Sequence, residues 1–161
     1  MISAHPTPTA SQLLNPAQTA ARLPYPKLLE ELVSLLQDRD VQVPPRLVLA
    51  LAGGGSLFVM PALDARTAIT KLITFTPANA GSSRATIQGD VVVFDVPSGE
   101  RRLILDGPTI TARRTAAVSV LAAQRLAPCK QGPVLIVGAG VQGKSHLEAF
   151  AEGMGITEFF I

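Results

Sequence analysis

The chain has 161 residues, 47% of them hydrophobic and 16% charged, with a net charge of +2. This composition predicts a globular protein, and the absence of a basic stripe and of Trp gives no indication of nucleic-acid binding. One cysteine, Cys129, excludes an internal disulfide and leaves metal or redox motifs without partners, so no metal is expected. The N-terminal sequence lacks the basic and apolar regions of a signal peptide, and we expect a cytoplasmic protein with no membrane partner.

The first 23 residues are rich in Pro, Thr, Ala and Ser, which predicts an N-terminal arm with little structure of its own until residues 17–23. Pro26 suits the first turn of a helix that runs to about Gln37. Its leucines form a broad apolar face, and we expect this helix to pack on a sheet.

A run of short strands follows. Residues 47–63 are uncharged, but three glycines and Pro61 interrupt them, which favours two strands and a turn over a membrane span. A four-residue connection containing Gly99 joins the last two strands as a hairpin. The pattern predicts a β-meander with strands at 47–51, 57–60, 68–75, 88–96 and 101–105.

A buried helix is predicted after the meander, capped by Thr109 or Thr111 and running to about residue 126. Arg113 and Arg114 would then lie in its first turn, where the helix macrodipole already places partial positive charge. A bound anion would offset that repulsion. The alternative is a bond to an acidic side chain such as Asp106, or exposure to water. We favour the anion site for Arg114 and the alternative for Arg113.

Three further side chains are candidates for chemistry. Lys71 interrupts an apolar strand, so its ammonium group must reach water or find a charged partner. That partner is equally well interpreted as a bound ligand or as a structural carboxylate of the protein. Arg46, at the start of a strand, is a weaker candidate by itself. His146 is interpreted as a helix-face residue rather than a catalyst, although histidine suits acid–base work.

Residues 127–132 form the predicted boundary to a second domain. An apolar strand at 134–137 runs into Gly138-x-Gly140-x-x-Gly143 and then into residues with helical spacing, the order that a dinucleotide-binding βαβ unit requires. A purely structural glycine-rich turn is the alternative. In the cofactor interpretation, the glycines, with Val141 and Gln142, place a pyrophosphate at the start of the helix.

Only 28 residues, Val134 to Ile161, follow the start of this strand, whereas a doubly wound domain needs two βαβαβ halves. We therefore expect the N-terminal part of a longer protein. The predicted division is an arm at 1–23, a substrate-binding and dimerisation domain at 24–127, and an incomplete Rossmann domain at 133–161. The 161-residue chain by itself is expected to have no useful activity.

Several separate motifs occur in one order and together resemble the ornithine cyclodeaminase/mu-crystallin family. The resemblance runs from about residue 24 to the last residue, and within the family it is greatest to reductases of Δ1-pyrroline-2-carboxylate and Δ1-piperideine-2-carboxylate. The motifs are Met60-Pro-Ala62, Lys71, Pro77-Ala-Asn79, Leu105-Asp-Gly107, Ile110-Thr-Ala-Arg-Arg-Thr-Ala-Ala117 and Gly138-Ala-Gly-Val-Gln-Gly-Lys-Ser-His-Leu-Glu-Ala-Phe150.

The resemblance implies a homodimer in which an α+β domain, a β-meander with flanking helices, precedes a Rossmann α/β domain. It also implies that Arg46, Lys71 and Arg114 hold the carboxylate of a small cyclic imino acid, and that NADPH or NADH is the cofactor. The aspartate that some members use in catalysis falls beyond Ile161, so no catalytic residue is assigned.

One departure from the family pattern bears on the reaction. Cyclodeaminases have a glutamate two residues before the Met-Pro pair, and this chain has Phe58 there. The resemblance therefore favours NAD(P)H-dependent reduction of a cyclic imine carboxylate to L-proline or L-pipecolate. The alternatives are a cyclodeaminase-type lyase with bound NAD and a non-catalytic ligand-binding protein of the mu-crystallin kind.

Overall fold

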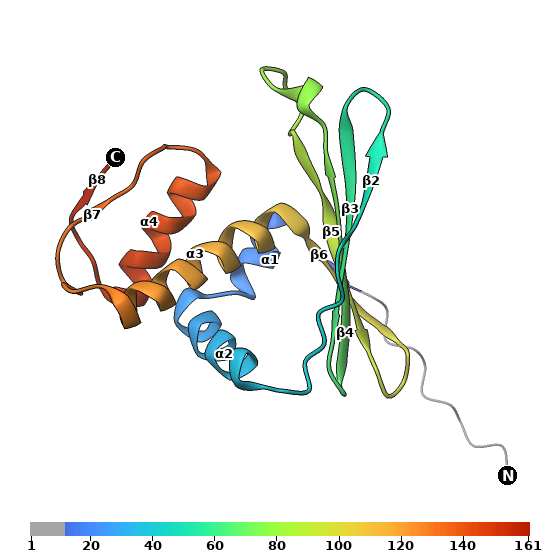
Figure 1. The fold of residues 1–161 in the computed structure, drawn as a ribbon, viewed down its shortest axis with the longest axis horizontal. Helices are drawn as coiled ribbons and strands as arrows, with labels where there is room; N and C mark the ends of the chain where they lie inside the picture. The colour runs from blue at the N-terminus through green and yellow to red at the C-terminus, as the bar shows by residue number, and fades with distance from the viewer. Residues whose placement is uncertain (1–11) are drawn as a thin grey trace, which may run out of the picture. The chain divides into compact units, whose positions relative to one another are not determined.

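The computed structural model describes residues 12–161, which form two compact units (Figure 1). Among the described residues, the sheet unit contains 12–15 and Asp40–Gly107. The helical unit contains Pro16–Arg39 and Pro108–Ile161. Each unit is described separately below.

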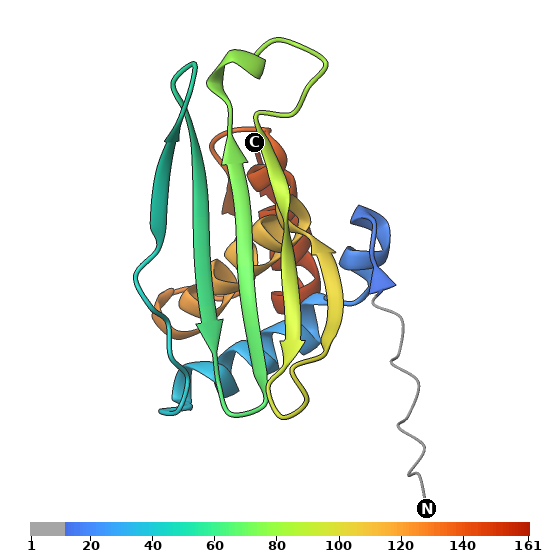
Figure 2. The same cartoon turned by 90° about the vertical axis from the view of Figure 1, so that its right-hand side faces the viewer.

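The sheet unit is a six-stranded sheet in the order β1-β6-β5-β4-β3-β2 (Figure 2). Strands β2 to β6 are antiparallel neighbours in chain order, which confirms the predicted meander. A short 3-10 helix, η1 (Pro77–Asn79), lies between β4 and β5. The strands are β1 (Gln12–Leu13), β2 (Leu47–Leu51), β3 (Gly55–Leu63), β4 (Thr67–Phe75), β5 (Ile87–Asp95) and β6 (Arg101–Asp106).

The third strand is longer than predicted and contains Pro61. The pairing with β2 ends at Val59, and an isolated bridge joins Leu63 to Gln42. Pro61 lies between these two contacts, at an edge where the regular ladder with β2 has already ended. Proline is tolerated in such edge positions, because no ladder bond depends on its missing N–H.

Regular structure in the arm was expected from about residue 17 and is observed already from Gln12, which corrects where it begins; residues 1–11 lie outside the described chain. Strand β1 pairs in parallel with β6, and the Leu14 amide donates to the Ile104 carbonyl at 2.9 Å. The side chain of Leu14 is buried. These backbone bonds use the open edge of β6 and need no long apolar pattern, so composition alone gave no sign of them.

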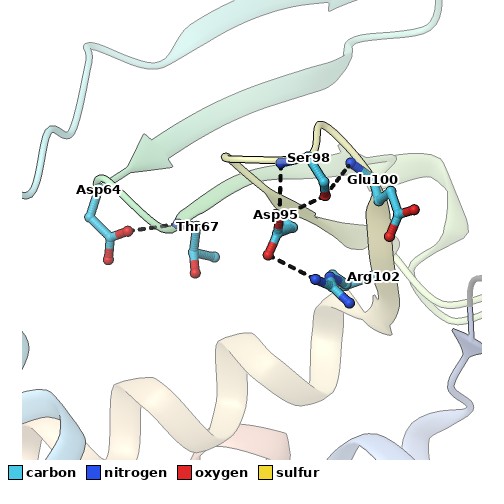
Figure 3. Close-up of polar contacts among 6 residues, drawn as sticks. All are labelled: Asp64, Thr67, Asp95, Ser98, Glu100 and Arg102. Atoms are coloured by element: carbon cyan, nitrogen blue, oxygen red, sulfur yellow. Dashed lines mark hydrogen bonds and ion pairs between the residues drawn. The ribbon is translucent and has the colours of Figure 1, made fainter. Parts of the chain in front are cut away.

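Two aspartates fix the tight turns at one end of the sheet (Figure 3). After β3, Asp64 Oδ1 accepts the amides of Arg66 and Thr67, both at 2.7 Å. At the end of β5, Asp95 accepts hydrogen bonds from the amide and the hydroxyl of Ser98 and from a guanidinium N–H of Arg102, the last at 2.9 Å. The bonds from Ser98 and Arg102 lower the pKa of Asp95 to about 2.

The helical unit has four helices and a two-stranded parallel sheet. The helices are α1 (Pro16–Ala21), α2 (Tyr25–Gln37), α3 (Gly107–Leu126, whose first residue belongs to the sheet unit) and α4 (Val141–Met154). Strands β7 (Val134–Leu135) and β8 (Phe159–Phe160) flank α4 and pair in parallel. This arrangement confirms the predicted βαβ unit after the α+β segment.

The core of the helical unit lies among α2, α3 and α4. We expected α2 to pack on a sheet. The structure shows that its buried Tyr25 and Leu29 cluster with residues of α3 and α4. The alanines on α3 and α4 let the helix backbones approach closely and leave room for these large residues. The cluster consists of Tyr25, Leu29, Ala116, Ala117, Val120 and Ala149.

Within residues 12–161, none of the helices has the length and apolar character needed to span a membrane.

Candidate dinucleotide and carboxylate sites

The turn between β7 and α4 has the geometry that its glycines predict. Gly138 has a φ of +108°, a left-handed conformation that side-chain-bearing residues rarely adopt. Gly143, the third residue of α4, packs on this turn, and an added Cβ would overlap the Gly138 carbonyl oxygen and lie 3.4 Å from Ile136 Cγ2. The missing side chain at Gly143 therefore lets the helix start directly against the turn.

Gly140 is the N-cap of α4 and provides no side chain to its first amides. A Cβ added at Gly140 would meet nothing within 4 Å, so the backbone there is open to a ligand. The N–H groups of the first helical turn, including those of Val141, Gln142 and Gly143, have no intrahelical acceptor. Together with the helix dipole, they form a site suited to a phosphate group.

Two hollows border the first half of α4. One, of about 160 Å³, lies beside the glycine turn and has Lys144 as its charged lining residue; the other residues are Ile136, Gly138, Ala139, Gly143, Leu147 and Ile161. The second, of about 460 Å³, lies between α1, the start of α3 and the start of α4. Lys144 lines both hollows, so a cation borders each of them.

The start of α3 corrects the sequence argument for an anion site. The helix begins at Gly107, with Pro108 in its first turn, a position that proline favours. Arg113 and Arg114 are therefore its seventh and eighth residues, beyond the free amides of the first turn. Because Gly-Pro was interpreted as a strand break, the helix was expected to start too late. The argument from the helix terminus is wrong, and Arg114 is left as an exposed arginine on α3.

Arg113 has a structural role, as we favoured. Its Nε donates to the Leu23 carbonyl at 2.8 Å, and its guanidinium carbon lies 3.9 Å from the centroid of the Tyr25 ring. A guanidinium nitrogen is also 3.7 Å from a carboxylate oxygen of Glu148, which takes the place of the suggested Asp106. The Arg113 side chain is only 13% exposed.

The two candidates in the sheet unit lie in neighbouring strands. Lys71 on β4 is half-buried and directly opposite Met60 on β3. Arg46 precedes β2, whose Leu47 pairs with Val59, so Arg46 is level with Met60 in the same row. Residues in one row share a face, and two strand spacings separate them by about 10 Å. Two long side chains at that spacing can converge on one carboxylate.

Arg114 lies on α3 in the helical unit, whereas Arg46 and Lys71 belong to the sheet unit. The site formed by all three residues therefore stays a prediction.

His146 lies on α4 and has hydrogen bonds at both ring nitrogens. Nε2 is 3.0 Å from the Ser119 hydroxyl on α3, and Nδ1 is 2.7 Å from the Gln142 carbonyl. Since a carbonyl only accepts, Nδ1 carries a proton. These bonds fit the helix-face interpretation.

Sequence reasoning missed the contacts between Tyr25 and Ser145. The Tyr25 hydroxyl, fully buried, is 2.9 Å from the Ser145 carbonyl and 2.7 Å from its hydroxyl. The one available signal was Tyr25 itself, the single tyrosine of the chain, at the start of an apolar helix face. A buried tyrosine needs a hydrogen-bond partner, but nothing in the sequence identifies a partner 120 residues away.

Comparison with known proteins decides the family. Residues 19–161 match the model of the ornithine cyclodeaminase/mu-crystallin family. The chain belongs to this family. It is 41% identical over 138 residues to Delta(1)-pyrroline-2-carboxylate reductase 2 of Burkholderia ambifaria, covering 84% of the chain and 44% of that protein. A Delta(1)-pyrroline-2-carboxylate/Delta(1)-piperideine-2-carboxylate reductase of Azospirillum brasilense gives the same identity and coverage.

The family fold also appears in solved structures. An archaeal alanine dehydrogenase dimer with bound NAD has a TM-score of 0.76 and 25% identity, and the match covers 92% of this chain and 47% of that one. The chain spans less than half the length of the two reductases that it matches. What it shares with them is the α+β segment and the first βαβ unit of a Rossmann fold.

Proposed function

We propose that the whole protein uses NADPH or NADH to reduce a cyclic imine carboxylate, Δ1-pyrroline-2-carboxylate or Δ1-piperideine-2-carboxylate, to L-proline or L-pipecolate. The observation that carries the proposal is the 41% identity, over 84% of the chain, to two proteins named as such reductases.

The glycine turn supports the cofactor. An open backbone at Gly140 and the first amides of α4 suit a pyrophosphate, and Gly143 brings the helix against the turn. The related archaeal alanine dehydrogenase holds NAD. When bound, the reduced nicotinamide supplies a hydride to C2 of the imine, and the nitrogen gains one proton overall.

In this proposal Arg46, Lys71 and Arg114 hold the substrate carboxylate. Each charge-assisted hydrogen bond is worth about 1.5–3 kcal/mol. Their task is orientation, because hydride transfer requires C2 within about 3–3.5 Å of the nicotinamide. A substrate that enters as the protonated iminium needs no strong protein acid at this step. We assign no catalytic residue in the 161-residue chain.

The surroundings of Phe58 favour reduction over ammonia elimination. Phe58 lies on β3 between Val48 on β2 and Ile73 on β4 in the register of the sheet. Phe58 is therefore an apolar side chain among apolar neighbours, at the position where cyclodeaminases have a glutamate. The phenyl ring of Phe58 cannot act as a general acid or base, whereas ammonia elimination that used this position would need such a group.

The test is oxidation of NADPH and of NADH by the full-length protein with each ring size of substrate. We expect turnover with at least one ring, and no ammonia release from ornithine. Absence of turnover with both rings would contradict the proposal. Ammonia release would favour a cyclodeaminase, and a melting shift with NADPH but no turnover would favour a mu-crystallin-like binding protein.

Three further features belong to the same proposal. We propose a homodimer, a cytoplasmic location, and a division into a substrate-binding domain at 24–127 and a dinucleotide-binding domain from 133. Packing groups the described residues differently from this division, since α2 and α3 belong with the C-terminal segment.

A further inference from the structure

A buried polar cluster joins α2, α3 and α4 next to the dinucleotide turn (helices in Figure 1). Tyr25 begins α2, Arg113 lies on α3, and Ser145 is the fifth residue of α4, two residues after Gly143. Tyr25 and Ser145 are buried, and the Arg113 side chain is almost so. The cluster therefore touches the first half of the helix whose amides face the proposed pyrophosphate.

The hydrogen bonds of Tyr25 act on one point of α4. The Ser145 carbonyl can only accept, so the Tyr25 hydroxyl donates its proton there at 2.9 Å. The Ser145 hydroxyl then donates to the Tyr25 oxygen at 2.7 Å. Burial raises the pKa of Tyr25, which keeps the donating form. Both bonds are made, and they hold α4 in place just after Gly143.

Arg113 connects α3 to the contact between Tyr25 and α4. It stacks on the Tyr25 ring at 3.9 Å, donates to the Leu23 carbonyl at 2.8 Å, and pairs with Glu148 one turn after Ser145. The next residue along α3 is Arg114, the proposed carboxylate ligand. The guanidinium of Arg113 thus contacts both the segment before α2 and a side chain of α4. Arg113 directly precedes Arg114 in the sequence.

We infer that Tyr25, Ser145 and Arg113 form a positioning cluster that holds the dinucleotide turn at a fixed place relative to Arg114. The inference rests on the proposed function, because it assigns the turn to the cofactor and Arg114 to the substrate carboxylate. These three are positioning residues: they act through α4 and Arg114 and need not touch either ligand.

Tyr25→Phe tests the cluster in the full-length protein, since it removes the hydroxyl and keeps the ring. We expect the dissociation constant of NADH or NADPH, measured by fluorescence, to rise about 3- to 10-fold, the worth of one hydrogen bond. The kcat for imine reduction should fall as well. The matched control is Gln124→Ala, which removes a bond of 3.1 Å from α3 to the Gly153 carbonyl at the far end of α4.

The control separates positioning from stability. Both variants should lower the melting temperature, but only Tyr25→Phe should weaken the dinucleotide. Equal effects on affinity, or a melting shift of Tyr25→Phe with unchanged affinity, would overturn the inference. Wild-type protein that binds neither dinucleotide would refute the proposed function instead, so the two failures are distinguishable.

Two further variants locate the effect. Ser145→Ala added to Tyr25→Phe should change the dissociation constant less than it does in the wild type, because both act through the same bonds. Arg113→Lys keeps the charge beside Glu148 but loses the planar group that stacks on Tyr25 and donates to Leu23. It should raise the KM for the imine several-fold through Arg114. Additive changes in the first experiment, or an unchanged KM in the second, would count against the cluster.

Discussion

Gly140 and Gly143 differ in what surrounds them, although both belong to the same motif. A methyl group at Gly140 would point into open space, whereas one at Gly143 would overlap the Gly138 carbonyl. Gly140 therefore leaves the backbone open to an approaching ligand, whereas Gly143 is needed for the packing of the protein itself.

This difference predicts two separable phenotypes. Gly143→Ala should destabilise the fold by about 1–3 kcal/mol, as overpacked sites do, and should also weaken dinucleotide binding. Gly140→Ala should weaken binding with little loss of stability. Urea denaturation and fluorescence titration of both variants measure the two effects. A stable Gly143→Ala protein with normal affinity would show that the turn relaxes without cost.

Arg114 can be compared with its neighbour Arg113, which differs in exposure and in contacts. Arg114→Gln should raise the KM for the cyclic imine about 10- to 150-fold, the worth of one charge-assisted hydrogen bond. The melting temperature should hardly change, because Arg114 is exposed. Arg113→Gln should lower the melting temperature, since it removes the contacts to Leu23 and Glu148. An unchanged KM for Arg114→Gln would remove it from the carboxylate site.

At the scale of elements, the turn between β5 and β6 contains a carboxyl group, that of Asp95, which is protonated only in acid. Asp95 has a folded pKa of about 2 against an ordinary value of 3.8, because Ser98 and Arg102 hydrogen-bond to its charged form. A lowered carboxyl pKa contributes stability above pH 3.8, and this contribution is lost as the pH falls toward 2. The loss should therefore occur between about pH 4 and pH 2.

Asp95→Asn should accordingly have a lower melting temperature than the wild type at pH 7, with the difference shrinking below about pH 4. Melting curves across pH 2–7 measure it, and Glu31→Gln, an exposed change on α2, is the control for lost charge. A difference independent of pH would mean that the Asp95 charge contributes nothing to the turn.

The sequence predicted most elements where a repeated pattern marks them. Strand β2 was predicted at 47–51 and is observed as Leu47–Leu51, and the helix predicted from Pro26 is observed as Tyr25–Gln37. Errors came where Pro was interpreted as a break: β3 continues through Pro61, and α3 starts with Gly107-Pro108. A proline in an edge strand or in the first turn of a helix lets the element continue. From the local sequence, such a proline looks the same as one that ends the element.

The site divides in the same way. The glycine turn follows from a local motif, so its position and its backbone geometry could be predicted. The contacts of Tyr25 and Arg113 depend on how three helices meet, which no local pattern encodes. Arg114 was singled out by an argument that the helix start has removed, and it now rests on family resemblance.

For the molecule as a whole, the two-stranded β7–β8 sheet leads to the last prediction. Within residues 12–161 these strands pair only with each other, and such a sheet leaves backbone edges and apolar faces open. Phe160 in β8 and Val137, just after β7, are exposed. We expect the 161-residue chain by itself to associate and not to oxidise NADPH with either imine. A stable monomer by light scattering that turns over substrate would contradict this.

The separation of 120 positions between Tyr25 and Ser145 has a consequence for synthesis on the ribosome. Helix α2 is made early, but the partners of its buried face on α3 and α4 follow only after the whole sheet unit. At a synthesis rate of about 5–20 residues per second, Ser145 is made roughly 6–24 s after Tyr25. During that interval the leucines of α2 lack these packing partners, and we expect this segment to be a candidate for chaperone binding in the nascent chain.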